Sequence, residues 1–393
     1  MKIIGKMGKN TKKNVESEIS FRMSFLKRIA KNANIAEGER AVEDIIRCIY
    51  RNQPISTKKI GQYTKLPLPI VAKVRSLLER QKILKRNPKG AVLKEEGIDF
   101  VENQLKLKLK HDLKCPVCNG RGIVLDDVFE EILKKHKTYS KMRPKVNTLI
   151  DQSFATAETA VHRAAFMADR GDLEGNRILF VGDDDLTSIP TAMSGLCEEV
   201  VVADIDDRLL DLIKNISKKE DLNIKTIKHD FKNPLSDELT EKFDTIFTDP
   251  PYTLNGLKLF LSRGIEALGS EGVAYLAFSH KPINEYLELQ KTINEMGFVI
   301  YESIPGFNFY EGTEIIGNTT FLARLIGKNL KKVVGDTEKI YTGEVKPTLR
   351  YYKCAKCGQV YEIGDEINRI EDLVCECGGK KFTMTKRKKV TKK

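Results

Sequence analysis

The stretch that decides the fold is RILFVGDDDLTS, residues 177–188, in which three aspartates follow a run of apolar residues. A second apolar run, EVVVAD, ends in an acid at Asp204. A strand, a loop and a second strand that ends in an acid form the frame of a dinucleotide-type α/β domain, where the acid accepts from ribose hydroxyls. The loop of such domains normally carries glycines, so the aspartates at 183–185 need an explanation.

The segment from 171 to 335 continues this alternation of strands and helices. We predict strands at 177–182, 199–204, 224–228, 243–248 and 271–279, and a later pair near 297–304 and 318–326. Helical periodicity between the first five favours a mostly parallel sheet. The predicted fold class is therefore α/β, a Rossmann-type, methyltransferase-like domain that late antiparallel strands complete.

Composition shifts divide the chain further. The predicted parts are a basic N-terminal extension (1–36), a winged-helix-like domain (37–110), a connector with a CxxC motif and a helix (111–170), the Rossmann-type domain (171–335), a cysteine-bearing module (348–384) and a basic tail (385–393). The second of these parts resembles a winged helix-turn-helix. Its second helix has few charges, which favours packing or dimerisation over DNA binding.

The net charge of +12 is unevenly distributed. Residues 171–330 carry 15 Lys and Arg against 27 Asp and Glu, so the enzyme-like part is acidic and the flanks are basic. The tail TKRKKVTKK (Thr385–Lys393) is typical of a solvated end, or of an arm for RNA or another polyanion. Nucleic acid is therefore expected only through the basic ends or the cysteine module.

The composition, with 41% hydrophobic and 31% charged residues, is that of a globular protein. No run approaches the ~20 apolar residues of a membrane span, and the N-terminus lacks the apolar core of a signal peptide. We expect a soluble, cytoplasmic protein. Many Lys, Glu and Ile and no Trp suggest a thermophile.

The most specific local motif is FDTIFTDPPYT, residues 243–253. A strand that ends at Asp249 should direct this side chain into the ligand crevice beyond the carboxyl ends of the strands. Pro250 and Pro251 stiffen the loop and leave the Asp249 carbonyl able to accept from an amine. Tyr252 can lie against a flat or cationic group. The motif resembles the loop of amino-group methyltransferases, although a plain proline turn is the alternative.

A nucleoside is expected at the neighbouring strand ends. Asp204 is placed to accept from both ribose hydroxyls, and Asp206 is either a second ligand or a helix-terminal acid. In KHDF, the residues His229, Asp230 and Phe231 end the third strand, where this architecture meets the adenine ring. Asp230 could accept from the exocyclic amine and Phe231 could pack on the base.

Three carboxylates at Asp183, Asp184 and Asp185 would repel the methionine carboxylate of S-adenosylmethionine. One like-charge pair at ~4 Å costs about 4 kcal/mol at an effective dielectric constant of ~20. Decarboxylated S-adenosylmethionine ends in an ammonium instead, and a polyamine carries several more. The acidic loop therefore favours cationic substrates, although one or two of the aspartates could merely cap the next helix, since a cap needs only one.

The motifs DQSFATAET, GDDDLTS, VVADID, HDF and DPPYT, in this order, resemble those of the archaeal and thermophilic branched-chain polyamine synthases, the N(4)-bis(aminopropyl)spermidine synthases. The resemblance covers residues 37–335. It implies a homodimer that transfers the aminopropyl group of decarboxylated S-adenosylmethionine to the internal secondary amine of spermidine, once or twice, and releases 5′-methylthioadenosine. It places the catalytic acid in the GDDD motif, here Gly182–Asp185, without saying which aspartate it is.

The chemistry fits these residues. The acceptor nitrogen must be neutral to attack, so a carboxylate must take its proton, and Asp184 or Asp185 is the expected base. Asp249 and Tyr252 would orient the amine. Glu158 in the preceding helix could hold a terminal ammonium, as could Glu311 and Glu314 in YEGTEIIGN.

Eight cysteines complete the inventory. Cys48 and Cys197 stand alone in apolar helical contexts and are expected in the core. Cys354, Cys357, Cys375 and Cys377 form two knuckles typical of a zinc ribbon, with a disulfide as the weaker alternative. Cys115 and Cys118 supply half a metal site, which could pair across a dimer, recruit other ligands or remain plain thiols.

The main rival reading is a nucleic-acid base methyltransferase that uses S-adenosylmethionine. The DPPY loop, the winged helix, the zinc ribbon and the basic ends all permit it. The acidic α/β domain and the absence of a glycine loop oppose it. A non-enzymatic regulator on the same fold is a second rival, but such a protein should have lost the DPPY loop. The cysteine module and the long basic N-terminus are not expected of the polyamine synthase family and leave another partner or acceptor open.

Overall fold

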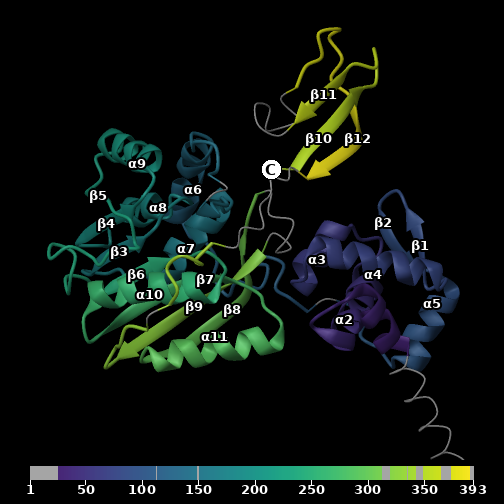
Figure 1. The fold of residues 1–393 in the computed structure, drawn as a ribbon, viewed down its shortest axis with the longest axis horizontal. Coiled ribbons are helices and arrows are strands. Elements are labelled where there is room, and N and C mark those ends of the chain that lie inside the picture. Colours follow the sequence, from purple (N-terminus) through teal and green to yellow (C-terminus); the bar gives the residue numbers. More distant parts are fainter. Residues whose placement is uncertain are drawn as a thin grey trace, which may run out of the picture.

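The computed structural model describes residues 25–393 except 112, 148–149, 312–318, 334, 342–347, 364–372 and 390–393. Figure 1 shows three bodies: an α-helical N-terminal part, a large α/β part and a small β module near the C-terminus. Within the described residues, no helix combines the length and the apolar character needed to cross a membrane.

The N-terminal part is a helical bundle with one hairpin. Its elements are α2 (Gly38–Asn52), α3 (Thr57–Thr64), α4 (Leu68–Arg80), β1 (Leu84–Asn87), β2 (Gly90–Leu93), α5 (Glu95–Asp99) and the π-helical turn η1 (Phe100–Gln104). Apolar residues at helical spacing on α2, such as Val42, Ile45 and Ile49, are fully buried. Residues between Phe25 and Ile35, in the segment expected to be an extension, also contribute to this core.

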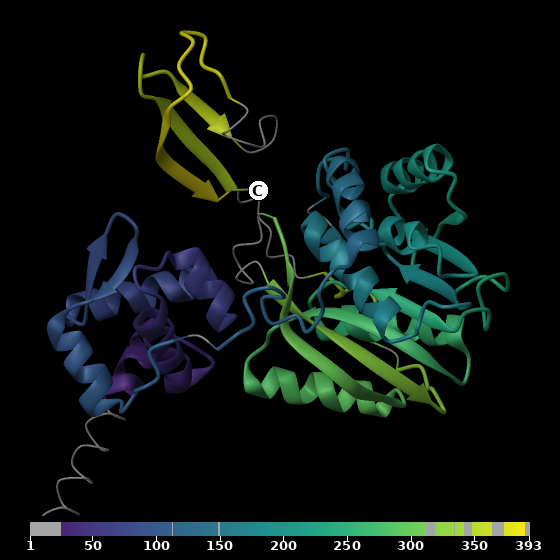
Figure 2. The ribbon, with the colours of Figure 1, turned by 180° about the vertical axis from the view of Figure 1, so that it is seen from behind.

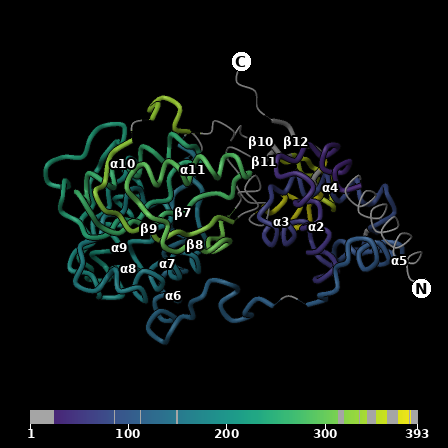
Figure 3. Tube along the Cα trace, turned by 90° about the horizontal axis from the view of Figure 1, so that it is seen from below, coloured from purple at the N-terminus to yellow at the C-terminus, as the bar shows by residue number. Residues whose placement is uncertain are grey.

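A stretch of chain between the N-terminal and α/β parts forms the connector (Figure 3). It leads into α6 (Asp127–Ser140) and α7 (Ala157–Asp169). Both helices begin with side-chain caps, at Asp126 and Thr156. Helix α7 packs on the sheet and brings its first turn close to the GDDD loop.

The α/β part is built on a seven-stranded sheet in the order β5-β4-β3-β6-β7-β9-β8. Its strands are β3 (Arg177–Val181), β4 (Glu199–Asp204), β5 (Ile224–Lys228), β6 (Thr245–Thr248), β7 (Glu271–Ser279), β8 (Phe298–Phe309) and β9 (Thr319–Lys328). The first five are parallel, and β9 runs antiparallel to both β7 and β8. This confirms the predicted mainly parallel α/β sheet with late antiparallel strands.

Helices cover both faces of this sheet (Figures 1 and 2). On one face, α7, α8 (Ser188–Met193) and α9 (Asp207–Lys219) pack over β3 and β4. On the other, α10 (Leu254–Leu268) and α11 (Ile283–Glu295) pack over β6 and β7. Because both faces are covered, the central strands are continuous apolar runs.

The C-terminal module has three antiparallel strands in the order β11-β10-β12. They are β10 (Thr348–Cys354), β11 (Val360–Ile363) and β12 (Phe382–Lys389). Two cysteine turns lie at one end of this small sheet.

Candidate active site

The three aspartates of the GDDD loop have three different environments. Asp183 is 3% exposed, and its carboxylate accepts from the backbone amides of Thr187 (2.7 Å) and Ser188 (3.1 Å). Burial raises its pKa to about 8. Asp183 therefore accepts from two backbone amides at the start of α8.

Asp185 is held inside the protein. Its carboxylate contacts the Arg163 guanidinium at 2.5 Å and also accepts from the backbone amide of Ala155. It is 2% exposed. Both contacts fix the position of its carboxylate and occupy its two oxygens.

Arg163 on α7 organises the centre of the site. It is fully buried, and besides Asp185 its guanidinium donates to Asp249 Oδ2 at 2.7 Å, to the Asn308 side chain at 2.8 Å and to the Tyr310 hydroxyl at 2.9 Å. The sequence reading missed this arginine because it lies in an apolar helical pattern. A charged residue at a buried helical position was the available signal.

Asp249 follows β6, as expected, and is held from three sides. Besides Arg163, the Tyr252 hydroxyl donates to Oδ1 at 3.0 Å and the Tyr310 hydroxyl to Oδ2 at 2.5 Å. Burial raises the pKa of Asp249 to about 6, although Arg163 opposes this shift. Tyr252 and Tyr310 stand nearly perpendicular, with ring centroids 6.4 Å apart. The two buried prolines, Pro250 and Pro251, fix the loop between Asp249 and Tyr252.

Asp184 differs from its neighbours because it is partly exposed. Among the described residues, its hydrogen-bond partner is the backbone amide of Ser153 at 3.3 Å, and no cation is paired with it. Its pKa is raised well above the ordinary value by burial, and then by Asp185, Asp249 and Asp204. Asp184 is therefore the member of the loop with an open carboxylate and a high proton affinity.

The donor half of the site lies at the ends of β4 and β5. Asp204 accepts from the backbone amides of Asp206 (2.8 Å) and Asp183 (3.0 Å), and burial raises its pKa. Gly182, at φ +79°, lies close to the Asp204 carboxylate, where a Cβ would be 3.9 Å from Oδ2. Asp206 caps α9 and pairs with Arg208, whose hydrogen bond lowers its pKa.

A cavity of about 500 Å³ opens beside these acids, lined by Lys145, Val146, Asn147, Ile150, Ile205, Asp206, Asp207 and Arg208. Ile205 follows Asp204 directly and is 38% exposed, so an apolar side chain lies beside this acid. The sequence reading missed Ile205, although its position next to Asp204 was a signal.

The HDF turn borders this half of the site. The His229 backbone amide donates to the Asp204 carbonyl at 2.9 Å, and Asp230 accepts from the backbone amide of Lys232 at 3.0 Å. Phe231 is 6% exposed and packs against Phe260 in the core, so little of its ring faces outward.

Another aromatic residue, Tyr341, approaches from the segment that follows the sheet. It is partly buried and lies close enough to Asp230, Asp151 and Asp204 for their charges to raise its pKa, after burial. The preceding residue, Ile340, is 2% exposed, and its carbonyl accepts from the Thr253 hydroxyl at 2.6 Å. The sequence reading missed Tyr341, and no motif marks it.

Of the predicted outer acids, Glu158 and Glu311 lie among the described residues. Glu158, in the first turn of α7, pairs with Lys137 at 2.9 Å on the surface. Glu311 is exposed, and its backbone amide donates to the Phe154 carbonyl at 2.9 Å. Glu314 lies outside the described residues.

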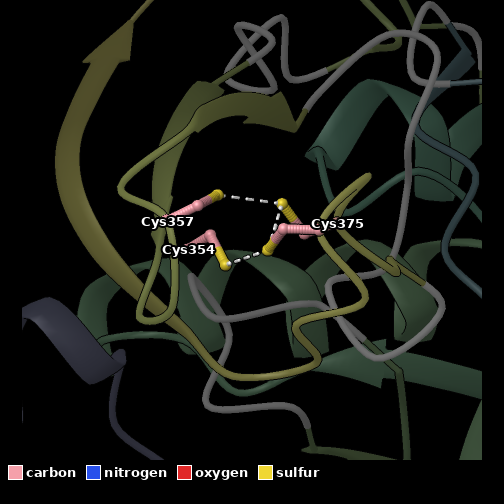
Figure 4. A group of neighbouring side chains, drawn as sticks. Cys354, Cys357 and Cys375 are labelled. Atoms are coloured by element: carbon pink, nitrogen blue, oxygen red, sulfur yellow. Dashed lines mark hydrogen bonds between the residues drawn. The ribbon is translucent and has the colours of Figure 1, made fainter.

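Four thiols gather in the C-terminal module (Figure 4). The sulfur atoms of Cys354, Cys357, Cys375 and Cys377 lie within 4.8 Å of one another, with separations of 3.3–3.7 Å between neighbours. Tetrahedral Zn²⁺ with four thiolates needs sulfur atoms about 3.8 Å apart, so the set fits this ion. At Gly379, a Cβ would lie 2.7 Å from the Cys354 sulfur, which explains the glycine after the second knuckle.

The two isolated cysteines differ in burial. Cys48 is 7% exposed and belongs to the N-terminal core, as expected. Cys197 is only partly buried and packs at the edge of the core beneath α8 and α9.

Comparison with known proteins gives the family of this chain. Residues 131–381 match the model of the branched-chain polyamine synthase A C-terminal domain. An uncharacterized protein of Methanocaldococcus jannaschii is 65% identical over 99% of both chains. The N(4)-bis(aminopropyl)spermidine synthase of the same organism is 33% identical over 73% of this chain and 82% of its own length.

A solved structure agrees with these sequence matches. The branched-chain polyamine synthase of Thermus thermophilus, in complex with N4-aminopropylspermidine and 5′-methylthioadenosine, superposes with a TM-score of 0.65 and 26% identity. The match covers 80% of this chain and 97% of the Thermus chain. With its matching sheet and its acidic GDDD and DPPYT loops, the chain belongs to the branched-chain polyamine synthase family.

Proposed function

We propose that this protein is an aminopropyltransferase that makes branched polyamines. The internal secondary amine of spermidine attacks the methylene carbon next to the sulfonium of decarboxylated S-adenosylmethionine. A carbon–nitrogen bond forms, the carbon–sulfur bond breaks, and 5′-methylthioadenosine leaves. A second transfer to the same nitrogen gives a quaternary ammonium.

The observation that carries this proposal is the state of the GDDD loop. Asp183 fills the amide cradle at the start of α8, where a methionine carboxylate would bind. Asp184 adds an open carboxylate beside it. A donor without a carboxylate and with an ammonium in its place suits both features. Membership in the family supports the same activity.

Asp184 is the proposed base. It has no cationic partner among the described residues, and its pKa is raised by burial and by neighbouring carboxylates. A carboxylate of high proton affinity can take the proton of the attacking amine, whereas Asp185 is committed to Arg163. The sequence favoured neither Asp184 nor Asp185 as the base, and we therefore choose Asp184.

The other residues divide between donor and acceptor. We assign the ribose hydroxyls to Asp204, the adenine wall to Ile205, and the rim of the nucleoside site to His229, Asp230 and Tyr341. Phe231 supports this rim from the core.

On the acceptor side, Asp249 offers its carboxylate to the amine, and Tyr252 and Tyr310 align that carboxylate through their hydroxyls. The aromatic faces of the two tyrosines can also lie against a cationic chain. Pro250 and Pro251 hold the loop rigid. Arg163 fixes the positions of the Asp185 and Asp249 carboxylates through its hydrogen bonds and does not contact the substrate.

The test is a product assay by mass spectrometry. The protein is incubated with spermidine and either decarboxylated or intact S-adenosylmethionine. We expect aminopropylated spermidine and 5′-methylthioadenosine with the first donor and no transfer with the second. Methylation of an added RNA or DNA by the intact donor would instead support the rival base methyltransferase.

The acceptor needs a separate panel. Methanocaldococcus jannaschii has both a 65% identical relative and a 33% identical N(4)-bis(aminopropyl)spermidine synthase. Two such proteins in one organism argue for different acceptor preferences. Spermine and longer linear polyamines should therefore be compared with spermidine by their kcat/KM values.

The C-terminal module is proposed to be a zinc ribbon over residues 348–384, in which the four thiolates Cys354, Cys357, Cys375 and Cys377 hold one structural Zn²⁺. Four free thiols require a reducing compartment, in line with the expected cytoplasmic location. The predicted basic tail, residues 385–393, begins inside the C-terminal sheet because β12 extends to Lys389, and this basic segment remains the proposed contact for a polyanion such as RNA.

The remaining domain assignments are proposals too. Residues 37–110, with the helix around residues 25–33, make a winged-helix domain whose hairpin β1–β2 is the wing. Residues 111–170 connect it to the Rossmann-type catalytic domain at 171–335. A homodimer is proposed on the family resemblance.

A further inference from the structure

The motif CPVCNGRG (Cys115–Gly122), here called the connector knuckle, has the backbone of a metal-binding turn. The backbone amides of Gly122, Gly120 and Arg121 and the Cys115 thiol are directed at the Cys118 sulfur. Asn119 (φ +50°), Gly120 (φ +82°) and Gly122 (φ +74°) have the left-handed conformations that such a tight turn needs. The turn is therefore already shaped around a thiolate.

The connector knuckle is anchored on one side only. Arg121 is 8% exposed, donates to the Phe307 carbonyl at 2.9 Å and stacks over the Phe309 ring at 4.9 Å. Ile123 is buried in the core of the α/β part. These contacts fix the knuckle on the catalytic domain, with the Cys115 thiol exposed and the Cys118 thiol 8% exposed.

The pair lacks the other ligands that a metal ion needs. A structural Zn²⁺ takes four ligands, and the knuckle supplies two. Within the part of the chain that the structure describes, the only group of three or more potential ligands is the C-terminal one of Cys354, Cys357, Cys375 and Cys377. Among the described residues, no third ligand groups with this pair, and a second copy of the chain would supply two further thiolates.

Exposed apolar residues flank the same turn in the sequence, between positions 109 and 128. Their exposed fractions are 42% for Leu109, 79% for Leu113, 72% for Val117, 62% for Val124 and 57% for Val128. Single exposed apolar residues are normal, but a run of them within one short connector indicates a surface that another protein covers. In Figure 3 the connector runs between the N-terminal and α/β parts along the edge of the molecule.

We propose that this surface is a two-fold interface between two copies of the chain, and that Cys115 and Cys118 of both copies together bind one Zn²⁺. A two-fold axis places the same patch opposite itself, so two half-sites of two thiolates make one site of four. The two thiols of each chain lose their protons on binding. The apolar residues around the knuckle then pack against their counterparts.

Zinc stoichiometry and assembly state test this directly. The full-length protein is purified under reducing conditions, its zinc is measured by plasma mass spectrometry, and its mass by analytical ultracentrifugation. We expect a dimer with about 1.5 zinc ions per chain, one from the C-terminal module and half from the shared site. The C115S/C118S variant should hold about one zinc per chain and sediment as a monomer.

A matched variant separates the two sites. C354S/C357S should remain a dimer and retain about half a zinc per chain. Two zinc ions per chain on a monomer would show that one chain completes the site alone and would overturn the proposal. A wild-type dimer with one zinc per chain, unchanged in C115S/C118S, would overturn it as well.

A second pair of variants leaves every cysteine in place. V117D should weaken the dimer at least tenfold, because it puts a charge in the apolar contact, and its thermal unfolding shows whether the fold is intact. L287D, at a 57% exposed position on α11, is the control and should leave the dimer constant unchanged. Equal dimer constants for the two variants would reject the knuckle surface as the interface.

Discussion

The donor and acceptor halves of the site both present carboxylates at strand ends, but they hold them differently. On the proposed donor side, both oxygens of Asp204 accept from backbone amides, although burial raises its pKa, and the hydrogen bond from Arg208 lowers the pKa of Asp206. On the proposed acceptor side, Asp249 is half-buried with a pKa raised to about 6, and burial and neighbouring carboxylates raise the pKa of Asp184 well above its ordinary value. The first arrangement suits carboxylates that only accept hydrogen bonds. The second suits a carboxylate that takes up a proton.

The largest effect should come from removing that proton acceptor. In Asp184→Asn the side chain keeps its size but cannot take the proton of the amine, so kcat should fall about 10²- to 10⁴-fold. Binding of 5′-methylthioadenosine, measured by calorimetry, should change little, because the donor half is intact. The measurement is the single-turnover rate of transfer from decarboxylated S-adenosylmethionine.

Asp183→Asn is the matched control for this loss. An asparagine can accept from one of the two amides at the start of α8 and turns its NH2 group toward the other, so stability should fall by about 1–3 kcal/mol while activity stays within about threefold. The pH dependence of kcat is a further test of the same assignment. Since Asp184 must be ionised to act, kcat should rise as pH increases through its raised pKa. Our assignment fails if Asp184→Asn keeps more than about a tenth of the wild-type rate or if Asp183→Asn loses more.

Arg163 should give the second largest effect, although it acts through other residues. Arg163→Lys keeps the charge but cannot contact Asp185, Asp249 and Asn308 together, so kcat should fall about 10²-fold. The donor KM should change much less than kcat, since no donor-side group touches the guanidinium. A purely structural role predicts instead a lower melting temperature with an unchanged kcat for the folded fraction.

The sequence predicted most of the fold because parallel strands covered on both faces are continuous apolar runs, such as RILFV at 177–181. The late strand was predicted too short, since β8 extends to Phe309 rather than ending near 304. Pro305 and Gly306 signal a turn, yet β8 is an edge strand, and a register irregularity between Ile304 and Asn308 accommodates them.

The sequence predicted the positions of single acids at strand ends and missed contacts between residues that are distant in the chain. Asp204 and Asp249 end strands, so their positions followed from topology. Arg163 could not be identified as a site residue from the sequence, because its partners Asp185 and Asp249 are 22 and 86 positions away in the chain. The three aspartates differ in their hydrogen-bond partners. These partners are backbone amides and Arg163 of α7, which the local sequence does not reveal.

On the donor side, Asp204→Asn should act on binding rather than on the chemical step. A hydrogen bond from a hydroxyl to a charged group contributes about 1.5 kcal/mol or more, so the donor KM should rise about tenfold while kcat changes little. Steady-state kinetics with decarboxylated S-adenosylmethionine as the varied substrate measures both parameters. A fall in kcat as large as that of Asp184→Asn would erase the contrast between the two halves.

The smallest effect, and the sharpest probe of the donor boundary, is at Tyr341. Its ring enters the nucleoside side from a segment that is pinned to Thr253 through the carbonyl of Ile340. Tyr341→Ala should weaken 5′-methylthioadenosine binding about threefold, and Tyr341→Phe should restore it if the ring packs on the nucleoside rather than donating through its hydroxyl. Calorimetric titration of both variants distinguishes these contacts. An unchanged affinity of Tyr341→Ala for 5′-methylthioadenosine would place the edge of the donor site at Asp230. The segment after the sheet would then have only a structural role.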